Sequence, residues 1–192
     1  MHKSFSEIIT SKPAVAFDLD DTLVHVTLLP PINLDKKNYF TITVKRRRFY
    51  VQMRPYLHYF LERISKIYDI YIFTASNKEY ANLIIDKILP NVKENHCFYK
   101  NSCIMVNGYF VKNLNIIGRP IQKILLIDDS SGSGLTNPKN LVKIKPWNGE
   151  KNDNALKDLL LLLEEIAYDN DLRISFEEFV KKSKLDGIGF FQ

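Results

Sequence analysis

A short apolar segment that ends abruptly in acidic residues is the feature that most constrains the fold of this chain. Ala14–Phe17 is apolar and leads directly into Asp18–Thr22, which reads Asp-Leu-Asp-Asp-Thr. A continuous apolar run of this kind predicts a buried strand of a parallel sheet. The acids then lie at the carboxyl end of the strand, the edge at which open α/β sheets bind ligands. We therefore expect an α/β fold with a functional site at this edge.

The spacing of the acids indicates metal-assisted chemistry. Asp18 and Asp20 are two residues apart, so both can project into one crevice where the strand opens into a loop. Packed carboxylates repel each other unless a cation neutralises them, and Mg²⁺ prefers hard oxygen ligands. A carboxylate in such a site can serve as a nucleophile. The alternative, a residue that only caps the following turn, is common for one Asp but explains this pattern less well.

Candidate strands and helices alternate along the chain, which predicts a mainly parallel sheet with helices on its faces. We expect strands at 69–73, 121–127 and 141–144, helices at 56–67, 77–89, 154–168 and 174–184, and β-hairpins at 39–53 and 103–111. The domain then spans 14–170, between an N-terminal arm at 1–13 and a C-terminal extension at 171–192 whose short helix packs on the domain.

Composition is typical of a globular protein and narrows the function only slightly. The 192 residues carry a net charge of +5. The chain has no apolar run of bilayer-spanning length and no signal-peptide pattern near its start, so a nuclear or cytoplasmic location is expected. The basic run Lys45–Arg48 is predicted to be a solvated hairpin turn, with a phosphopeptide contact or nuclear import as minor alternatives. Direct nucleic-acid binding is not expected, because basic and aromatic residues are not interleaved.

Four motifs in a fixed order connect the chain to a known family. They are Phe17–His25, Tyr71–Ser76, Val111–Leu114 and Leu125–Ser130, with Met53–Leu57 as a further helix start. Together they resemble the FCP/SCP (NLI-interacting-factor-like) C-terminal-domain phosphatases of the haloacid dehalogenase superfamily. The resemblance implies a HAD-like, Rossmann-like parallel sheet flanked by helices, with small β-hairpin insertions and no large cap domain.

The resemblance also implies roles for individual residues. Asp18 would be the nucleophile and Asp20 the general acid and base. Thr74 and Lys112 would bind the phosphoryl group. Mg²⁺ would be held by Asp18, Asp20 (through its backbone carbonyl in family members) and Asp129.

Supporting roles fall to four further residues, namely Thr22, Asp128, Arg54 and Ser76. Arg54 has an equally good interpretation as a structural residue that pairs with an acid at a helix start. The chain departs from the family at Asn113, where an Asp is common, and at Ser131–Gly134, which replaces the usual Ser-Pro and is expected to be a flexible loop.

The implied activity is that of a Mg²⁺-dependent protein serine/threonine phosphatase that forms an aspartyl-phosphate. Its substrate would be a phosphorylated protein segment, such as the C-terminal domain of RNA polymerase II. One alternative is a non-catalytic binding module similar to the domain of the mitochondrial presequence receptor, which the stretch Lys145–Gly149 resembles. The other alternative is a small-molecule phosphatase of the same superfamily, although such enzymes often carry a larger cap.

Overall fold

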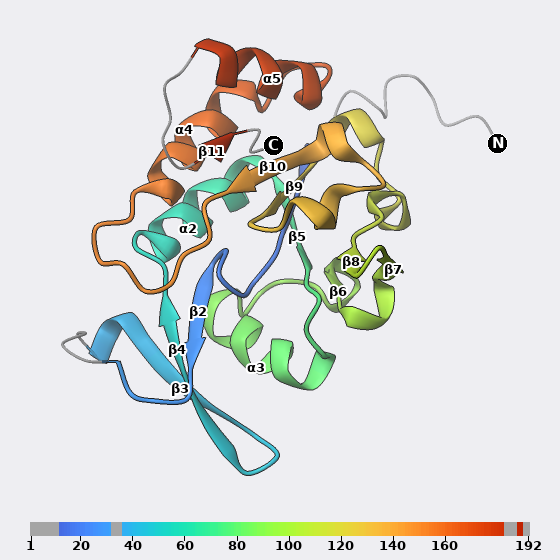
Figure 1. Ribbon diagram of the computed structural model, residues 1–192. Coiled ribbons are helices and arrows are strands. Elements are labelled where there is room, and N and C mark those ends of the chain that lie inside the picture. The colour runs from blue at the N-terminus through green and yellow to red at the C-terminus, as the bar shows by residue number, and fades with distance from the viewer. Residues whose placement is uncertain (1–11, 32–35, 183–187, 190–192) are drawn as a thin grey trace.

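The central feature of the fold is a six-stranded sheet with the order β11-β10-β9-β1-β5-β6 (Figure 1). The computed structural model describes residues 12–31, 36–182 and 188–189, so most of the expected N-terminal arm lies outside the described residues. The strands are β1 (Ala14–Phe17), β5 (Asp69–Phe73), β6 (Cys97–Phe98), β9 (Ile124–Asp128), β10 (Leu141–Ile144) and β11 (Ile188–Gly189). Neighbouring strands are parallel except for β11, which is antiparallel to β10. The predicted parallel sheet is confirmed.

Strand β1 lies in the middle of this sheet, where the strand order reverses. Val15 is in register with Ile70 of β5 on one side and with Leu125 of β9 on the other. The chain proceeds from β1 to β5 and β6, and then returns across β1 to β9 and β10. Such a reversal opens a crevice at the carboxyl ends of the strands. The residues that follow β1 and β9 are therefore brought to one place.

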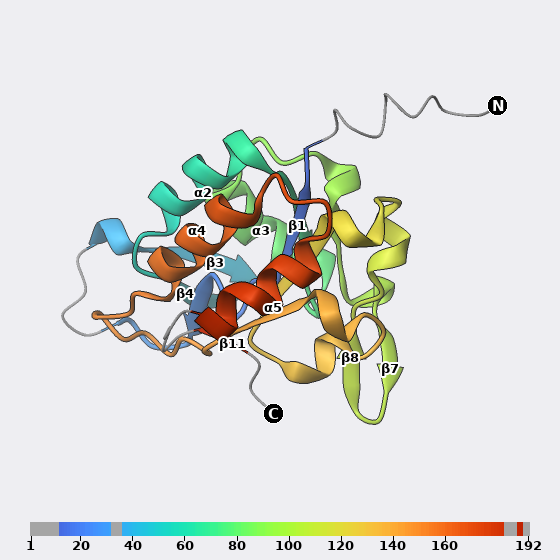
Figure 2. The same cartoon turned by 90° about the horizontal axis from the view of Figure 1, so that it is seen from above.

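The α-helices of the described residues pack on one face of the sheet. They are α2 (Leu57–Ile67), α3 (Lys78–Ile88), α4 (Ala155–Ile166) and α5 (Leu172–Lys182). Three of them, α2, α4 and α5, lie side by side in Figure 2. In α2 the buried residues Leu57, Phe60, Leu61 and Ile64 keep the spacing of one helical face. Each such side chain contributes about 1.5–3 kcal/mol when buried. The predicted helices are confirmed, with bounds that differ by at most two residues from those expected.

Short 3-10 helices pack on the other face of the sheet, where Leu114, Ile117 and Ile121 join its core. The described residues form the 3-10 helices η1 (Lys36–Asn38), η2 (Glu94–His96), η3 (Lys100–Ser102), η4 (Leu114–Ile117), η5 (Ile121–Lys123), η6 (Ser131–Gly134) and η7 (Pro138–Asn140). The hairpin of β7 (Ile104–Val106) and β8 (Tyr109–Val111) lies beside η6. A small second core of Ala16, Phe73, Leu114 and Leu126 lies on this side.

A second, three-stranded antiparallel sheet projects from the domain beside α3 (Figure 1). It has the order β2 (Val24–Thr27), β4 (Arg47–Met53) and β3 (Tyr39–Val44). The predicted hairpin at 39–53 is confirmed as β3 and β4. Strand β2 was not predicted, because its partner in the sheet lies far along the chain. No element larger than these insertions caps the sheet within the described ranges, as predicted.

Two local predictions need correction. The strand expected at 121–127 begins only at Ile124, because the residues after Pro120 form a 3-10 turn. The expected flexible loop Ser131–Gly134 is instead a 3-10 helix with three buried residues. A Cβ on Gly132 would lie 2.0 Å from Cδ1 of Tyr109, so glycine permits this close packing.

Among the described helices, none has the length and apolar character needed to cross a bilayer.

Candidate active site

The acidic loop after β1 is held in a tight conformation by the backbone. The amide of Asp18 donates to the carbonyl of Ile127 at 3.0 Å, which extends the pairing of β1 with β9 by one residue. The amides of Leu23 and Val24 then both donate to the carbonyl of Leu19, at 2.9 and 3.0 Å. Asp21, the residue at the bend, has a left-handed φ of 56°, which Asp tolerates better than most residues. The loop therefore reverses sharply and leaves Asp18 at the strand end.

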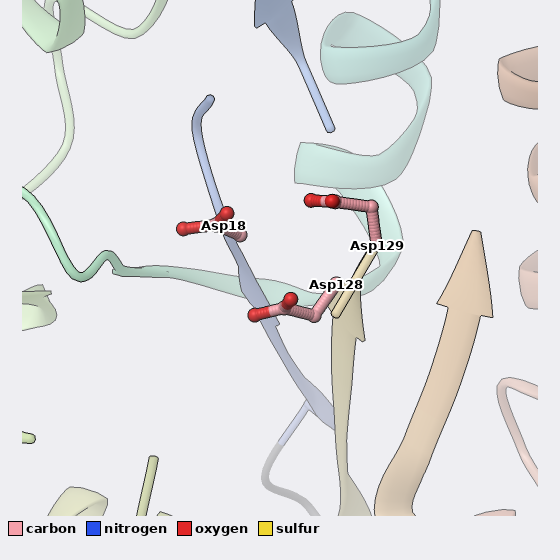
Figure 3. Close-up of side chains that lie close together, drawn as sticks. All are labelled: Asp18, Asp128 and Asp129. Carbon is pink, nitrogen blue, oxygen red and sulfur yellow. The ribbon is translucent and has the colours of Figure 1, made fainter. Parts of the chain in front are cut away.

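Three carboxylates from two strands meet at this edge of the sheet (Figure 3). Asp18 follows β1, Asp128 ends β9 and Asp129 comes directly after it. Each contributes an oxygen atom, and these oxygens lie within 4.8 Å of one another. The parallel register of β1 and β9 brings them together across more than a hundred residues of sequence, and the cluster holds Asp128 where the expected metal ligands were Asp18, Asp20 and Asp129.

Lys112 is buried against two of these carboxylates. Its Nζ lies 2.8 Å from Oδ1 of Asp18 and 2.5 Å from Oδ2 of Asp128. Its backbone amide donates to the carbonyl of Ser133 at 2.9 Å, so the buried turn η6 helps to position it. Only 2% of Lys112 is exposed, and a buried charge needs such partners. Lys112 is thus placed to balance negative charge at the site.

The pKa values of these acids and of Lys112 are shifted by burial and by the charges of their neighbours. Burial raises the pKa of Asp18 to about 7; Lys112 opposes this shift and Asp128 adds to it. Burial also raises the pKa of Asp129, with the charge of Asp128 as the next cause. Burial lowers the pKa of Lys112, but the two carboxylates together outweigh it, so the pKa stays above its ordinary value. The lysine remains charged, and further positive charge would favour the ionised acids.

Asp20 is held apart from these three carboxylates by two hydroxyl groups. Ser76 Oγ donates to Oδ2 of Asp20 at 2.7 Å, and the Tyr80 hydroxyl donates to Oδ1 at 2.6 Å. Burial, together with the charge of Asp20, raises the pKa of Tyr80, so it remains a neutral donor. Both carboxylate oxygens of Asp20 thus have a fixed partner, and its carboxylate has a different environment from that of Asp18.

Thr22, a predicted supporting residue, and Thr74, a predicted phosphate-binding residue, differ in their contacts. Thr22 Oγ1 donates to Oδ1 of Asp129 at 3.0 Å. Thr74 is buried directly after β5, the strand next to β1, and its Oγ1 accepts the amide hydrogen of Ser76 at 3.0 Å. Thr22 therefore links the acidic loop to β9, while Thr74 shapes the turn that leads into α3.

Arg54 lies in the interior, and each of its three side-chain nitrogens donates a hydrogen bond. It is 1% exposed. Its Nε and Nη2 donate to the carboxylate of Asp153 at 2.8 and 2.9 Å, Nη1 donates to the carbonyl of Thr22 at 2.9 Å, and Nη2 also donates to the carbonyl of Lys145 at 2.9 Å. Of the two interpretations drawn from the sequence, these contacts favour the structural one. Through these hydrogen bonds, Arg54 connects the acidic loop at Thr22 to Asp153 in the segment before α4.

The carboxylates at this edge suit a hard divalent cation, because their oxygen atoms are the kind of ligand that such an ion prefers. Both oxygens of Asp128 have partners, Lys112 and the amide of Ser130, the latter at 2.8 Å. Asp18 is bonded through one oxygen to Lys112, and Asp129 through one oxygen to Thr22. No other side chain in the described part of the chain donates to Asp18 or Asp129. These two carboxylates can therefore hold Mg²⁺, whereas the carboxylate of Asp20 is engaged elsewhere.

Several contacts of the site were not predicted from the sequence. The spacing of Tyr80 with Ile84 and Ile88 is that of a core residue, so nothing in the sequence pattern indicates that its hydroxyl reaches Asp20. Asp153 belongs to none of the sequence motifs, so nothing near it in the sequence indicates that it pairs with Arg54.

The family comparison covers most of the chain. The family described as NLI interacting factor-like phosphatase matches residues 13–173. CTD small phosphatase-like protein 3 of Caenorhabditis elegans is 35% identical over 158 residues, which cover 82% of this chain and 55% of that protein. Phosphatase PSR1 of Saccharomyces cerevisiae is 30% identical over 168 residues, covering 88% of this chain and 39% of that protein. The chain therefore spans about half, or less, of the length of these relatives.

The fold comparison agrees with the observed topology. A solved structure titled as that of Fcp1, an essential RNA polymerase II CTD phosphatase, matches with a TM-score of 0.59 at 19% sequence identity, covering 91% of this chain and 55% of the other. At this identity the match bears on the fold alone, which is HAD-like. The family match over residues 13–173 shows that this chain belongs to the NLI interacting factor-like phosphatase family.

Proposed function

We propose that this chain is a Mg²⁺-dependent protein serine/threonine phosphatase that acts through an aspartyl-phosphate. The observation that carries the proposal is the meeting of Asp18 with Asp128 and Asp129 at the strand ends, with the buried amine of Lys112 2.8 Å from Asp18. A nucleophilic carboxylate, a fixed cation and a set of hard oxygen donors are the parts that phosphoryl transfer to an Asp requires.

In the first step an oxygen of Asp18 attacks the phosphorus atom. A bond forms between this oxygen and phosphorus, and the bond from phosphorus to the serine or threonine oxygen breaks. Asp20 donates a proton to the departing oxygen. Its carboxyl group is held by Ser76 and Tyr80 at 2.7 and 2.6 Å, so it is already oriented before substrate binds.

In the second step Asp20 accepts a proton from a water molecule, whose oxygen attacks the phosphorus of the aspartyl-phosphate. The bond between phosphorus and the Asp18 oxygen breaks, which releases inorganic phosphate and restores the enzyme. Lys112 and the hydroxyl of Thr74 would stabilise negative charge on the phosphoryl oxygens. Asp18, Asp129 and the backbone carbonyl of Asp20 would hold Mg²⁺. When bound, the ion would neutralise charge on these acids and on the phosphoryl group.

The proposed substrate is a phosphoserine or phosphothreonine in a protein segment, such as the C-terminal domain of RNA polymerase II, and the proposed location is the nucleus or cytoplasm. The small size of the insertions supports a protein substrate, because no large cap encloses the acidic edge within the described ranges. Family members named as CTD small phosphatases support the same substrate class. One relative, of Xenopus laevis, is named CTD nuclear envelope phosphatase 1.

The test compares the native protein with Asp18→Asn, using phosphoserine peptides, sugar phosphates and nucleotides, each with Mg²⁺ and with a chelator. We expect turnover of the peptides that needs Mg²⁺ and is lost in Asp18→Asn. A matched control is Asp21→Asn, because Asp21 is a neighbouring acid whose side chain is 43% exposed and bonds to His25.

Each alternative function has its own outcome in this assay. A preference of more than tenfold in kcat/KM for a metabolite, equal to about 1.4 kcal/mol, would establish a small-molecule phosphatase. Binding of peptides without turnover in any condition would establish a binding module. Full activity after exhaustive metal removal would overturn the Mg²⁺ requirement.

A further inference from the structure

Four consecutive cations, Lys45–Arg48, lie on the turn between β3 and β4 and on the first two residues of β4, and we call them the basic tip. All four residues are exposed. The side chains of the tip form no ion pair or hydrogen bond with any residue that the structure describes, so no acid of these residues neutralises the four adjacent charges. Unneutralised like charges on one turn repel each other and favour binding of an anion. The tip is therefore a concentrated positive surface that the fold itself does not use.

The backbone fixes the shape of this surface. Lys45 and Arg46 have φ values of 46° and 67°, which are those of the tight hairpin turn that suits the twist of two antiparallel strands. Val44 is in register with Arg47, and Thr43 with Arg48. The cations are thus held on a regular hairpin, and their backbone needs little ordering when a ligand binds.

A chain of contacts connects this hairpin to the proposed general acid. Phe49, one residue beyond the tip, packs edge-to-face on the ring of Tyr80, with 6.3 Å between the ring centroids. The hydroxyl of the same Tyr80 donates to Asp20 at 2.6 Å. Arg47 lies on the same face of β4 as Phe49, because side chains alternate along a strand.

These contacts set the span from the tip to the reacting centre. With a rise of about 3.4 Å per residue along β4, the basic tip lies on the order of 15–20 Å from Asp20. An extended peptide covers that span with about five residues at roughly 3.3 Å each. A substrate bound at Asp18 can therefore reach the tip with a residue about five positions away.

The chemistry of the tip favours phosphate. Three of its four cations are Arg, whose planar guanidinium groups bind phosphate through paired hydrogen bonds. A phosphate group also carries nearly two negative charges and three acceptor oxygens, more than a single carboxylate offers to such a cluster. The distance of the tip from Asp20, which an extended peptide covers with about five residues, favours a protein segment over a nucleic acid, for which one turn is a short contact surface.

We infer that the basic tip binds a second phosphate group on the substrate, about five residues from the phosphate that is removed. This inference rests on the proposed protein phosphatase function and extends it to substrates with more than one phosphate. The enzyme would then prefer multiply phosphorylated segments, because the second phosphate adds binding energy outside the reacting centre.

The test removes the positive charge of the tip without changing the catalytic residues. The variant combines Arg46→Gln, Arg47→Gln and Arg48→Gln. Its matched control combines three exposed lysines away from the hairpin, Lys87→Gln, Lys93→Gln and Lys182→Gln. Both variants lose three charges, so a general effect of net charge would appear in both.

The kinetic readout uses a peptide with two phosphoserines five residues apart, the same peptide with one phosphoserine, and p-nitrophenyl phosphate. For the doubly phosphorylated peptide we expect kcat/KM of the tip variant to fall at least tenfold, mainly through KM. The control variant should retain its activity, and p-nitrophenyl phosphate should be hydrolysed equally by all three proteins. An equal loss on both peptides, or in both variants, would overturn the inference.

A binding readout keeps this test independent of turnover. The same three arginine changes are added to Asp18→Asn, and the affinity for the doubly phosphorylated peptide is measured by fluorescence anisotropy. Affinity should fall at least tenfold relative to Asp18→Asn alone, even if the chain proves to be no phosphatase. Equally tight binding of a peptide with glutamate as its second anion, or of a single-stranded RNA, would show a general polyanion surface and refute a phosphate site.

Discussion

Removing the buried guanidinium of Arg54 should destabilise the whole domain. The change is Arg54→Met, which keeps much of the apolar stem but removes every donor. The side chains of Arg54 and Asp153 are 0% and 9% exposed, so the charge of Asp153 would stay buried without its partner. Breaking a buried ion pair in this way typically costs about 3–5 kcal/mol. The carbonyls of Thr22 and Lys145 would lose a donor as well.

The expected loss is large compared with the total stability of a domain, which is about 5–15 kcal/mol. For a domain of this size, about 3–5 kcal/mol corresponds to a fall in Tm of roughly 6–20 °C. Urea unfolding can be followed by the fluorescence of Trp147, the one tryptophan in the sequence, which is buried. If Arg54→Met does not fold, Arg54→Lys offers a milder test, because Lys keeps the charge but cannot form the paired hydrogen bonds.

Arg63 provides the matched control. It also pairs with an acid, Glu164, but the two side chains are 47% and 27% exposed. Exposed pairs contribute about 0.2–1 kcal/mol, so Arg63→Met should change stability little. Equal small losses in both variants would refute the structural role of Arg54. An Arg54→Met protein of native stability that has lost activity would instead favour the substrate-binding interpretation.

Three further changes test other parts of the site. Tyr80→Phe removes one of the two hydroxyl donors to Asp20. Because a hydrogen bond to a charged acceptor contributes about 1.5–3 kcal/mol, kcat should fall about 10–100-fold at nearly unchanged Tm. An unchanged kcat would exclude a role of Tyr80 in positioning Asp20. Gly132→Ala places a Cβ 2.0 Å from Tyr109 Cδ1, and overpacking of this kind should cost about 1–3 kcal/mol in urea unfolding; a neutral effect would show that the turn can shift. Mg²⁺ at about 100 times its Kd should stabilise the native protein against thermal unfolding by about 2.7 kcal/mol, and should stabilise the Asp129→Asn protein much less. An equal gain in stability in both proteins would exclude Asp129 as a ligand.

Much of the fold could be predicted because its signals are local. The buried face of α2 repeats at helical spacing in the sequence, and Asn107-Gly108 marks the turn between β7 and β8, with φ values of 50° and 83°. Strand β2 and the pairing of β11 with β10 have no such signal. They exist because a partner strand many residues away supplies hydrogen bonds.

The turn Ser131–Gly134 shows how tertiary contacts override a local pattern. Alternating Ser and Gly residues are typical of a flexible loop. Here the small residues instead let the ring of Tyr109 lie directly on the turn, and the carbonyl of Ser133 accepts the amide hydrogen of Lys112. The same composition that favours flexibility in isolation permits close packing in the folded chain.

The sequence by itself determined that acids follow a buried strand and that a second pair, Asp128 and Asp129, follows another. That much depends on residue type and short-range periodicity. Only the tertiary structure decided that Asp18 meets this pair around Lys112, while Asp20 turns to the hydroxyls of Ser76 and Tyr80. The physical reason is that each carboxylate takes the donor or charge nearest to it in space, and that donor comes from a distant part of the chain.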